Sequence, residues 1–172
     1  MRLAKRSNSF NRLYYKNYKF SYIIGLVSCF TRKGYKIYAY NIISKFLFKI
    51  KTFYKQDIDI LLTNVFNKYV PLFSFLTKKI AANVYSLPWL IESNRAKFVL
   101  IKWFLNASVM RSEHDIVLRL FNEFNDLYLG YGKTVKKIED YYALAIKNRP
   151  FTRFLRKRRK VFLSRLKKYG VY

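Results

Sequence analysis

The residue types of a hydrolytic triad stand together in the run Ser112-Glu113-His114-Asp115. A triad needs its serine, histidine and carboxylate to converge on one line of proton transfer, whereas neighbouring residues on a helix point about 100° apart. His114 is the only histidine and Cys29 the only cysteine, so histidine-based acid catalysis or zinc binding would rest on these two residues. We therefore interpret the run as a helix start and expect no enzyme activity.

Gly132-Lys133-Thr134 has the residue types that close a phosphate-binding P-loop. That motif needs a further glycine five positions before Gly132, where this chain has Leu127. The preceding segment also has the pattern of a helix rather than a strand. These glycines are better interpreted as a helix terminus.

Two carboxylate pairs, Asp57 with Asp59 and Glu139 with Asp140, have residue types that attract metal ions. Their more ordinary roles are to compensate a helix dipole and to form local salt bridges. We expect neither a metal nor another cofactor.

Positive charge is the dominant chemical property of the chain, with 35 lysines and arginines against nine acids and a net charge of +26. All nine acids lie within residues 57–140, where 11 basic residues nearly balance them. Residues 1–56 carry 13 basic residues and residues 141–172 carry 11. A nearly neutral body with two cationic ends favours a polyanionic partner, and nucleic acid is the first candidate.

A membrane surface is the other polyanion to consider. The longest uncharged runs, residues 20–31 and 80–91, have 12 residues each, whereas a spanning helix needs about 20. We expect no membrane insertion. The basic, acid-free N-terminus fits a mitochondrial transit peptide and an RNA-binding arm equally well.

Residue usage bears on the origin of the chain. Phe and Tyr number 16 each, and Lys, Asn and Ile are frequent while Ala and Gly are scarce, as AT-rich codons would impose. We infer an organellar genome, mitochondrial in the first instance, as a hypothesis.

Apolar spacing predicts a largely helical fold. Residues Leu100, Trp103, Phe104 and Ala107 follow the i, i+3, i+4, i+7 pattern of one buried helical face. Further helices are expected over residues 20–31, 35–54 and 58–68, with a break at Gly34 and with Ile42, Phe46 and Ile50 in register.

Ser112 is expected to cap the next helix, with Asp115 completing a capping box and Glu113 near the positive dipole end. The buried face of this helix would comprise Ile116, Leu120, Phe124 and Leu127. Gly130 and Gly132 would supply the positive-φ positions that end it. A last helix would bury Val135, Ile138, Tyr142 and Ala145.

The period changes between Pro71 and Ile91. Aromatic and β-branched residues there predict two strands on either side of residues 77–83, and hence a β-hairpin at about 72–91. No Asn-Gly or Asp-Gly turn pins the tip, and residues 80–82 are compatible with a helix too.

Several motifs occur in an order that resembles a known family. The strongest is Gly132-Lys133-Thr134-Val135-Lys136-Lys137-Ile138-Glu139-Asp140, followed by Ala145 and Asn148-Arg149-Pro150-Phe151. Others are Gly34 with Lys36, Ala39 and Ile42; Pro71 and Tyr85-x-x-Pro88 around the hairpin; Lys102-Trp103; and Leu118-Arg119-Leu120-x-Asn122-Glu123. From about Ile23 to Leu155 the chain resembles the bacterial-type small-subunit ribosomal protein seven family.

The chain also departs from that family pattern. The glycine pair at the hairpin tip is replaced by Ala81-Ala82, and the basic residues there are reduced to Lys78 and Lys79. Of an arginine pair before the fourth helix, Arg95 survives and Ala96 replaces the other. A basic tail over residues 157–168 continues past the usual end of the family.

The resemblance implies a mainly α fold, a single domain of the six-helix type with one protruding β-hairpin. We divide the chain into a basic N-terminal arm (residues 1–19), the helical domain (residues 20–155) and a basic C-terminal extension (residues 156–172). It further implies a structural protein of the small ribosomal subunit that binds the 3′ (head) domain of its rRNA and nucleates head assembly. Neighbouring ribosomal proteins, messenger RNA and exit-site transfer RNA are its implied partners, without homo-oligomers.

Two alternatives remain on the residues alone. A non-ribosomal organellar RNA-binding protein or a membrane-peripheral basic factor would show the same charge. A mitochondrial small ribosomal subunit is the expected location, with another organellar or a bacterial ribosome as the alternative.

Charge and resemblance together predict the RNA contacts, which are cations on the arms, the helix junctions and the hairpin. They are Arg2, Lys5, Arg6, Arg12, Lys33, Lys36, Lys78, Lys79, Arg95, Lys102, Arg111, Lys136, Lys137, Arg149, Arg153, Arg156, Arg158 and Arg159. The aromatic excess adds a hypothesis of base stacking by Tyr14, Tyr15, Tyr18 or Tyr172. Trp103 and Phe104 are expected in the core.

Overall fold

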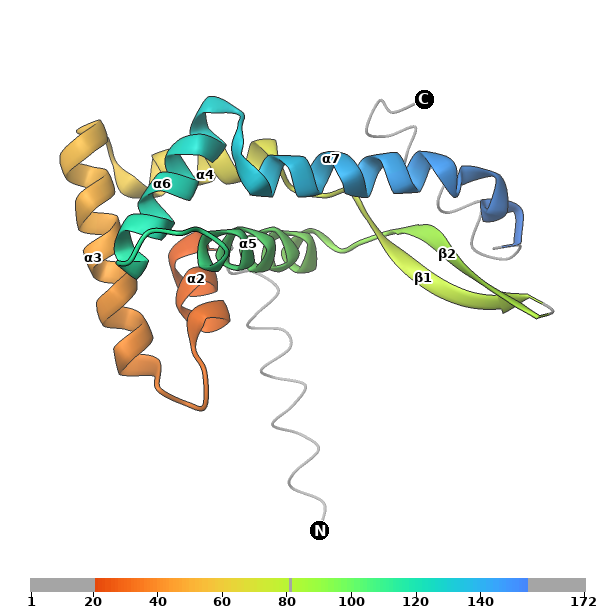
Figure 1. Ribbon diagram of the computed structural model, residues 1–172, viewed down its shortest axis with the longest axis horizontal. Helices are drawn as coiled ribbons and strands as arrows, with labels where there is room; N and C mark the ends of the chain where they lie inside the picture. Colours follow the sequence, from red (N-terminus) through yellow and green to blue (C-terminus); the bar gives the residue numbers. More distant parts are fainter. Residues whose placement is uncertain (1–20, 81, 155–172) are drawn as a thin grey trace, which may run out of the picture.

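The computed structural model describes residues 21–80 and 82–154. Within them, helices and one hairpin follow in the order α2 (Tyr22–Phe30), α3 (Lys36–Tyr54), α4 (Ile58–Lys68), β1 (Phe73–Ile80), β2 (Asn83–Leu90), α5 (Ser93–Val109), α6 (Ile116–Leu129), α7 (Gly132–Lys147) and the 3-10 helix η1 (Arg149–Phe154). Helices α5 and α7 lie side by side along the long axis, and α3 stands across one end (Figure 1). The expected mainly α fold with one hairpin is confirmed.

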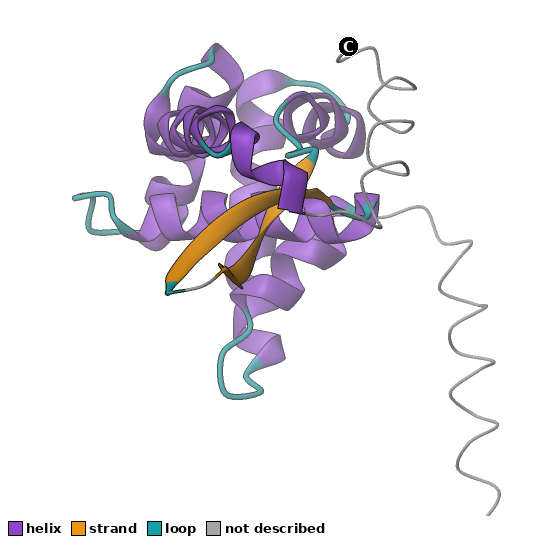
Figure 2. Ribbon diagram, turned by 90° about the vertical axis from the view of Figure 1, so that its right-hand side faces the viewer, coloured by secondary structure: helices purple, strands orange, loops and turns teal. Residues whose placement is uncertain are grey.

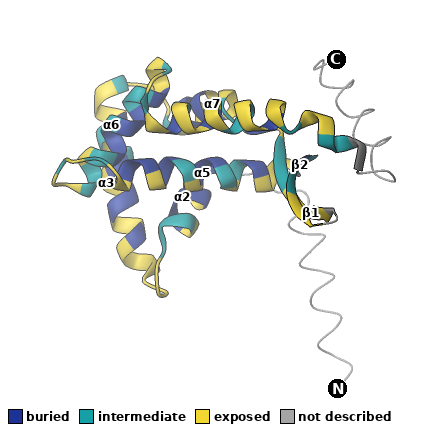
Figure 3. Ribbon diagram, turned by 45° about the vertical axis from the view of Figure 1, so that its right-hand side comes forward, coloured by how far each residue is buried: buried dark blue, intermediate teal, exposed yellow. Residues whose placement is uncertain are grey.

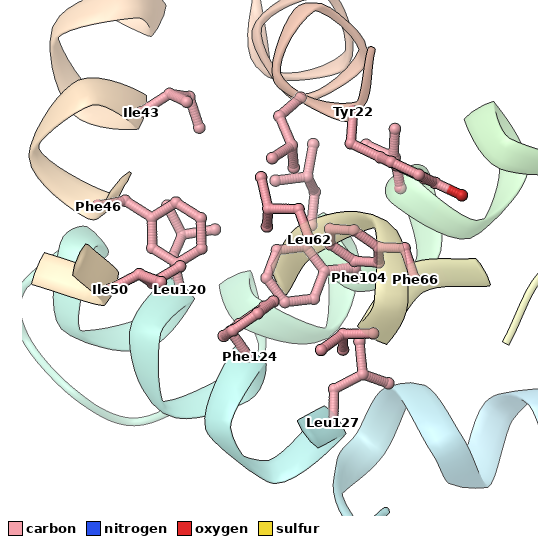
Figure 4. Close-up of a cluster of buried hydrophobic side chains, with 14 of the residues drawn as sticks. Tyr22, Ile43, Phe46, Ile50, Leu62, Phe66, Phe104, Leu120, Phe124 and Leu127 are labelled. Carbon is pink, nitrogen blue, oxygen red and sulfur yellow. The ribbon is translucent and has the colours of Figure 1, made fainter. Parts of the chain in front are cut away.

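Four phenylalanines form the centre of the core. Phe46, Phe66, Phe104 and Phe124 come from four different helices and are all fully buried. Their rings meet at centroid distances of 5.5–6.4 Å, mostly edge to face (Figure 4). Each such side chain contributes about 1.5–3 kcal/mol through burial, so this cluster joins α3, α4, α5 and α6 into one unit.

The expected helical faces are confirmed. Ile42, Phe46 and Ile50 are buried on α3, and Leu120, Phe124 and Leu127 on α6, where the predicted Ile116 is only partly buried. On α7, Ile138 and Ala145 are buried, while Val135 and Tyr142 pack partly buried against the core.

One expected core residue lies nearer the surface. Phe104 is fully buried as predicted, but Trp103 is only partly buried against the core, as is Cys29. Burial raises the pKa of the Cys29 thiol, and nearby Lys102 lowers it by less.

Helix α6 begins later than the capping box predicted. Asp115 is the N-cap, and its carboxylate accepts a hydrogen bond from Val117 N at 3.1 Å. Ser112 therefore does not cap the helix, and Glu113 lies before it. At the other end, Gly130 ends the helix with φ 89° as predicted, but Gly132, with φ 99°, starts α7 instead.

The hairpin is more regular than its sequence predicts. Antiparallel pairing runs from Phe73 opposite Leu90 to Ile80 opposite Asn83, so β-structure covers most of residues 77–83 as well. Only residues 81 and 82 separate the strands, and Ala81 at the tip lies outside the described residues. The hairpin projects from the end of the helical body opposite α3, and Figure 2 looks onto that end.

No helix in the described part of the chain has both the length and the apolar character needed to cross a membrane. The basic arm and the C-terminal extension lie outside the described ranges, so that domain division stays a prediction.

Candidate nucleic-acid interface

The structure describes the side chains of ten of the predicted RNA contacts. Arg2, Lys5, Arg6, Arg12, Arg156, Arg158 and Arg159 lie outside the described residues, and Arg153 is described only as backbone in η1. Of the ten, all except Arg111 are exposed. The nine exposed cations are Lys33, Lys36, Lys78, Lys79, Arg95, Lys102, Lys136, Lys137 and Arg149.

These cations are spread over several elements rather than gathered in one cluster. Lys33 and Lys36 are at the α2–α3 turn, Lys78 and Lys79 are near the hairpin tip, and the others are on α5, α7 and η1. Exposed residues extend along much of α3 and α7 (Figure 3). Such an extended distribution suits a long, folded polyanion better than a small anionic ligand.

Most of the exposed cations lack a carboxylate partner. Among described residues, Lys33, Lys36, Lys79, Arg95, Lys102, Lys136 and Lys137 form no ion pair. Even the acidic pair Glu139 and Asp140, close to Lys136 in sequence, forms no ion pair with it. The charge of these seven cations is therefore available for phosphate groups.

The α2–α3 turn presents its lysines through an unusual backbone. Lys33 and Gly34 both have positive φ, at 50° and 83°. Lys36 N then donates to Gly34 O at 2.8 Å, and α3 begins without a side-chain cap at Tyr35. Free N–H groups at a helix start favour anions, which adds to the charge of Lys33 and Lys36.

The hairpin is held at its root by aromatic rings. Tyr141 of α7 stacks on Phe73 at 5.3 Å and meets Phe75 edge-on at 4.8 Å, and its hydroxyl donates to Phe73 O at 3.2 Å. Trp103 of α5 meets Tyr141 at 4.8 Å, and Lys137 Nζ lies 5.9 Å from the centre of the Trp103 ring. This root fixes the direction of β1 relative to the lysines of α7.

A second contact holds the other strand. The Tyr85 ring of β2 lies 4.5 Å from that of Phe151 in η1. Tyr85 and Phe151 belong to two of the motifs that carry the family resemblance, and the contact gives both residues a structural reason. Arg95 lies inside the first turn of α5 rather than before that helix.

Arg111 differs from the other nine cations, because its side chain is engaged in ion pairs within the fold. Its guanidinium lies 2.9 Å from Glu113, 2.9 Å from Glu123 and 2.6 Å from Asp126, and its side chain is 19% exposed. Burial lowers the pKa of Arg111, but hydrogen bonds to the three carboxylates outweigh it and raise that pKa overall. With three acids around one cation, Arg111 is less available for phosphate than the nine exposed cations.

Glu123 is the buried centre of the same network, and the sequence analysis missed its role. Its Oε1 accepts hydrogen bonds from Thr134 N at 3.0 Å and Thr134 Oγ1 at 2.7 Å, while Oε2 binds Arg111. Glu123 and Thr134 are both fully buried. A carboxylate from α6 thus satisfies an N–H group in the first turn of α7.

Close packing at this α6–α7 joint explains Gly132. A Cβ atom there would lie 3.0 Å from Asp126 Cβ and 3.3 Å from Glu123 Oε1, and φ is 99°. Lys133 Nζ donates to Met110 O at 2.7 Å, so the resemblance to a P-loop has a purely structural explanation. A signal was present in the sequence: Glu123 falls on the apolar stripe of α6, where an acid needs a buried partner.

Glu113 is held in its ionised form. A hydrogen bond from Asn122, a backbone hydrogen bond and then Arg111 lower its pKa to about 2. Arg119 Nε also donates to the carbonyl oxygen of Glu113. The acids of this region therefore serve the joint between α5, α6 and α7.

Comparison with known proteins agrees with this geometry. The sequence profile of the family described as Ribosomal protein S7p/S5e matches residues 3–149. The small ribosomal subunit protein uS7 of Pelagibacter ubique is 27% identical over 129 residues, covering 75% of this chain and 83% of the relative. The uS7 protein of Mycoplasmopsis pulmonis is 29% identical over the same length with the same coverage, and that of Rhodospirillum centenum is 28% identical over 128 residues, covering 74% and 82%. The chain belongs to the Ribosomal protein S7p/S5e family, whose members are structural components of the ribosome and not enzymes.

Proposed function

We propose that this structural protein of the small ribosomal subunit binds the 3′ (head) domain of the subunit rRNA. Through that binding it nucleates assembly of the head, and its hairpin lies near the messenger exit and the exit-site transfer RNA. The observation that carries the proposal is the set of exposed cations without carboxylate partners, on a body in which every ion pair between described residues is made by Arg111, with Glu113, Glu123 and Asp126.

The arrangement suits recognition by shape. Folded RNA presents phosphates and 2′-hydroxyls over a wide surface, and proteins read it more by charge and contour than by base edges. Here the core fixes α5 and α7, and the aromatic root fixes the hairpin, so the cations keep their spacing before RNA binds. Such preorganisation reduces the conformational entropy that the protein loses when it binds.

Binding to the 3′ head domain of small-subunit rRNA, against an unrelated structured RNA of equal length at about 0.15 M salt, tests the proposal. We expect a strong preference for the head domain. Equal affinity for both RNAs would leave a basic protein without the proposed target.

A charge-matched pair of variants tests the role of α7. Replacing Lys136 and Lys137 by Ala should weaken head-domain binding and reduce the slope of log affinity against log salt by roughly 0.7 to 0.9 for each lost phosphate contact. Replacing Lys45 and Lys51 by Ala removes the same charge from exposed positions on α3 and serves as the control. Equal changes in the two double variants would contradict a specific role for Lys136 and Lys137.

The ribosome that contains this protein is proposed to be mitochondrial. The support is the residue usage, rich in Phe, Tyr, Lys, Asn and Ile, which AT-rich organellar codons produce. Locating the gene decides the point: an organellar genome with AT-rich codons is expected, and a gene with balanced codons in a nuclear or bacterial genome would remove the basis.

A further inference from the structure

A groove between the α2–α3 turn and the start of α6 is not accounted for by the contacts described so far. It has a volume of about 600 Å³. Its walls include Phe30, Tyr35, Tyr38 and Val109, with Arg32 and Arg119 among them. The size lies within the range of about 300–1,000 Å³ that is usual for small-molecule sites.

The tyrosines of this groove contribute little to the core. Tyr35 is 69% exposed and Tyr38 is 67% exposed. Neither ring stacks on another ring within the part of the chain that the structure describes. Both rings line the groove and remain open to solvent, so they can stack on a flat ligand.

Positive charge surrounds the groove, which favours an anionic ligand. Arg32 and Arg119 line it, Lys33 and Lys36 follow in the same turn, and no acid is among the lining residues. Two carboxylates lie in the nearby α5–α6 loop. Glu113 is bound by Arg111, and Asp115 accepts from Val117 N.

The terminal segments of this chain do not match such a groove. Residues 1–19 carry six basic residues and no acid, and residues 156–172 carry eight basic residues and no acid. Either segment would bring more positive charge to Arg32 and Lys33. Charge complementarity therefore favours a separate, anionic occupant.

We propose that this groove holds one unpaired nucleotide of the small-subunit rRNA, with its base against Tyr35 and Tyr38 and its phosphate on Arg32. The inference rests on the proposed function and adds a specific site to it. Aromatic rings beside cations are the combination that binds single-stranded nucleotides, because every base offers a π-face and every nucleotide a phosphate. Stacking thus occurs at the α2–α3 turn, in addition to any at the terminal tyrosines.

The test separates stacking from charge. Replacing Tyr35 and Tyr38 by Leu should weaken head-domain binding roughly 5- to 150-fold, the loss expected for one stacked base, with an unchanged salt slope. Replacing both by Phe keeps the rings and should retain most of the affinity. Tyr40→Leu is the matched control, since Tyr40 is 61% exposed on the same helix and does not line the groove.

Arg32→Ala should instead lower the affinity. It should also reduce the slope of log affinity against log salt by roughly 0.7 to 0.9, the value for one lost phosphate contact. Circular dichroism of each variant verifies the fold, which exposed side chains should leave intact. The inference is overturned if the Leu double variant binds as the wild type does, or no worse than Tyr40→Leu. It is also overturned if the Leu double variant binds head-domain RNA normally but is recovered less well with whole subunits, because a protein then fills the groove. A wild-type chain without preference for the head domain would sink the proposed function instead.

Discussion

Removing the buried carboxylate of the α6–α7 joint should destabilise the protein far more than removing an exposed one. Glu123 is fully buried and binds three groups, Thr134 N, Thr134 Oγ1 and Arg111 Nη1, at 2.7–3.0 Å. In Glu123→Leu all three interactions disappear, while Thr134 stays out of reach of water. The joint would then contain an unsatisfied N–H group at the start of α7.

The magnitude follows from those groups. An unsatisfied buried donor costs about 1–3 kcal/mol, and breaking a buried ion pair costs about 3–5 kcal/mol when the remaining charge has no other partner. Arg111 keeps Glu113 and Asp126, so only part of the second cost applies. We expect Glu123→Leu to lower the free energy of unfolding by about 3–5 kcal/mol. Glu123→Gln should lower it by about 1–2 kcal/mol, because the amide oxygen still accepts from Thr134.

Equilibrium unfolding in urea, followed by circular dichroism at neutral pH, measures these changes. Glu139 is the matched control, since it is an exposed acid on α7, and its Leu and Gln variants should change the unfolding free energy by no more than about 0.5 kcal/mol. If Glu123→Leu cost no more than Glu139→Leu, the joint would not depend on this carboxylate. If Gln and Leu at position 123 cost the same, its bonds to Thr134 would contribute nothing.

Three further changes test other parts of the structure. Gly132→Ala should lower the free energy of unfolding in urea by about 1–3 kcal/mol, because φ is 99° and the added Cβ would meet Asp126. An unchanged free energy of unfolding would contradict that geometry. The lowered pKa of Glu113, about 2, means its stabilising effect is complete above the ordinary value of 4.5 and is lost as pH falls toward 2. Stability should therefore fall less steeply with acid in Glu113→Gln than in the wild type, and equal slopes would refute this. Trp103→Ala should cost about 1.5–3 kcal/mol, since the ring is partly buried; a loss near 5 kcal/mol would place it in the core.

Helix positions were predictable because apolar periodicity is a local signal. The expected helix over residues 58–68 has those same bounds in the structure, and the buried faces of α3 and α6 follow from spacing alone. The hairpin was predictable from composition and a change of period. The continuation of its strands to Ile80 and Asn83 was not, because pairing across the hairpin overrides the weak preference of residues 77–83.

The joint around Arg111 was not predictable for a different reason. In a chain with 35 basic residues, an arginine in a loop has the sequence context of an RNA contact. Two of its three carboxylate partners, Glu123 and Asp126, are 12 and 15 residues away on another element. The start of α6 was ambiguous in the sequence too. Ser112 and Asp115 are both good capping residues, and the structure shows that Asp115 is the one whose carboxylate accepts from Val117 N.

A net charge of +26 constrains how such a protein can be held together, because surface ion pairs would consume the cations that phosphates need. The described structure separates the two demands. Buried or partly buried carboxylates serve one arginine at the α6–α7 joint. The hairpin root uses Phe73, Tyr141 and Trp103. Contacts between such rings are only weakly sensitive to salt, whereas phosphate contacts depend on it steeply. The direction of the hairpin is thus set by interactions that RNA does not compete for, and the proposed RNA contact would use its lysines from a fixed position.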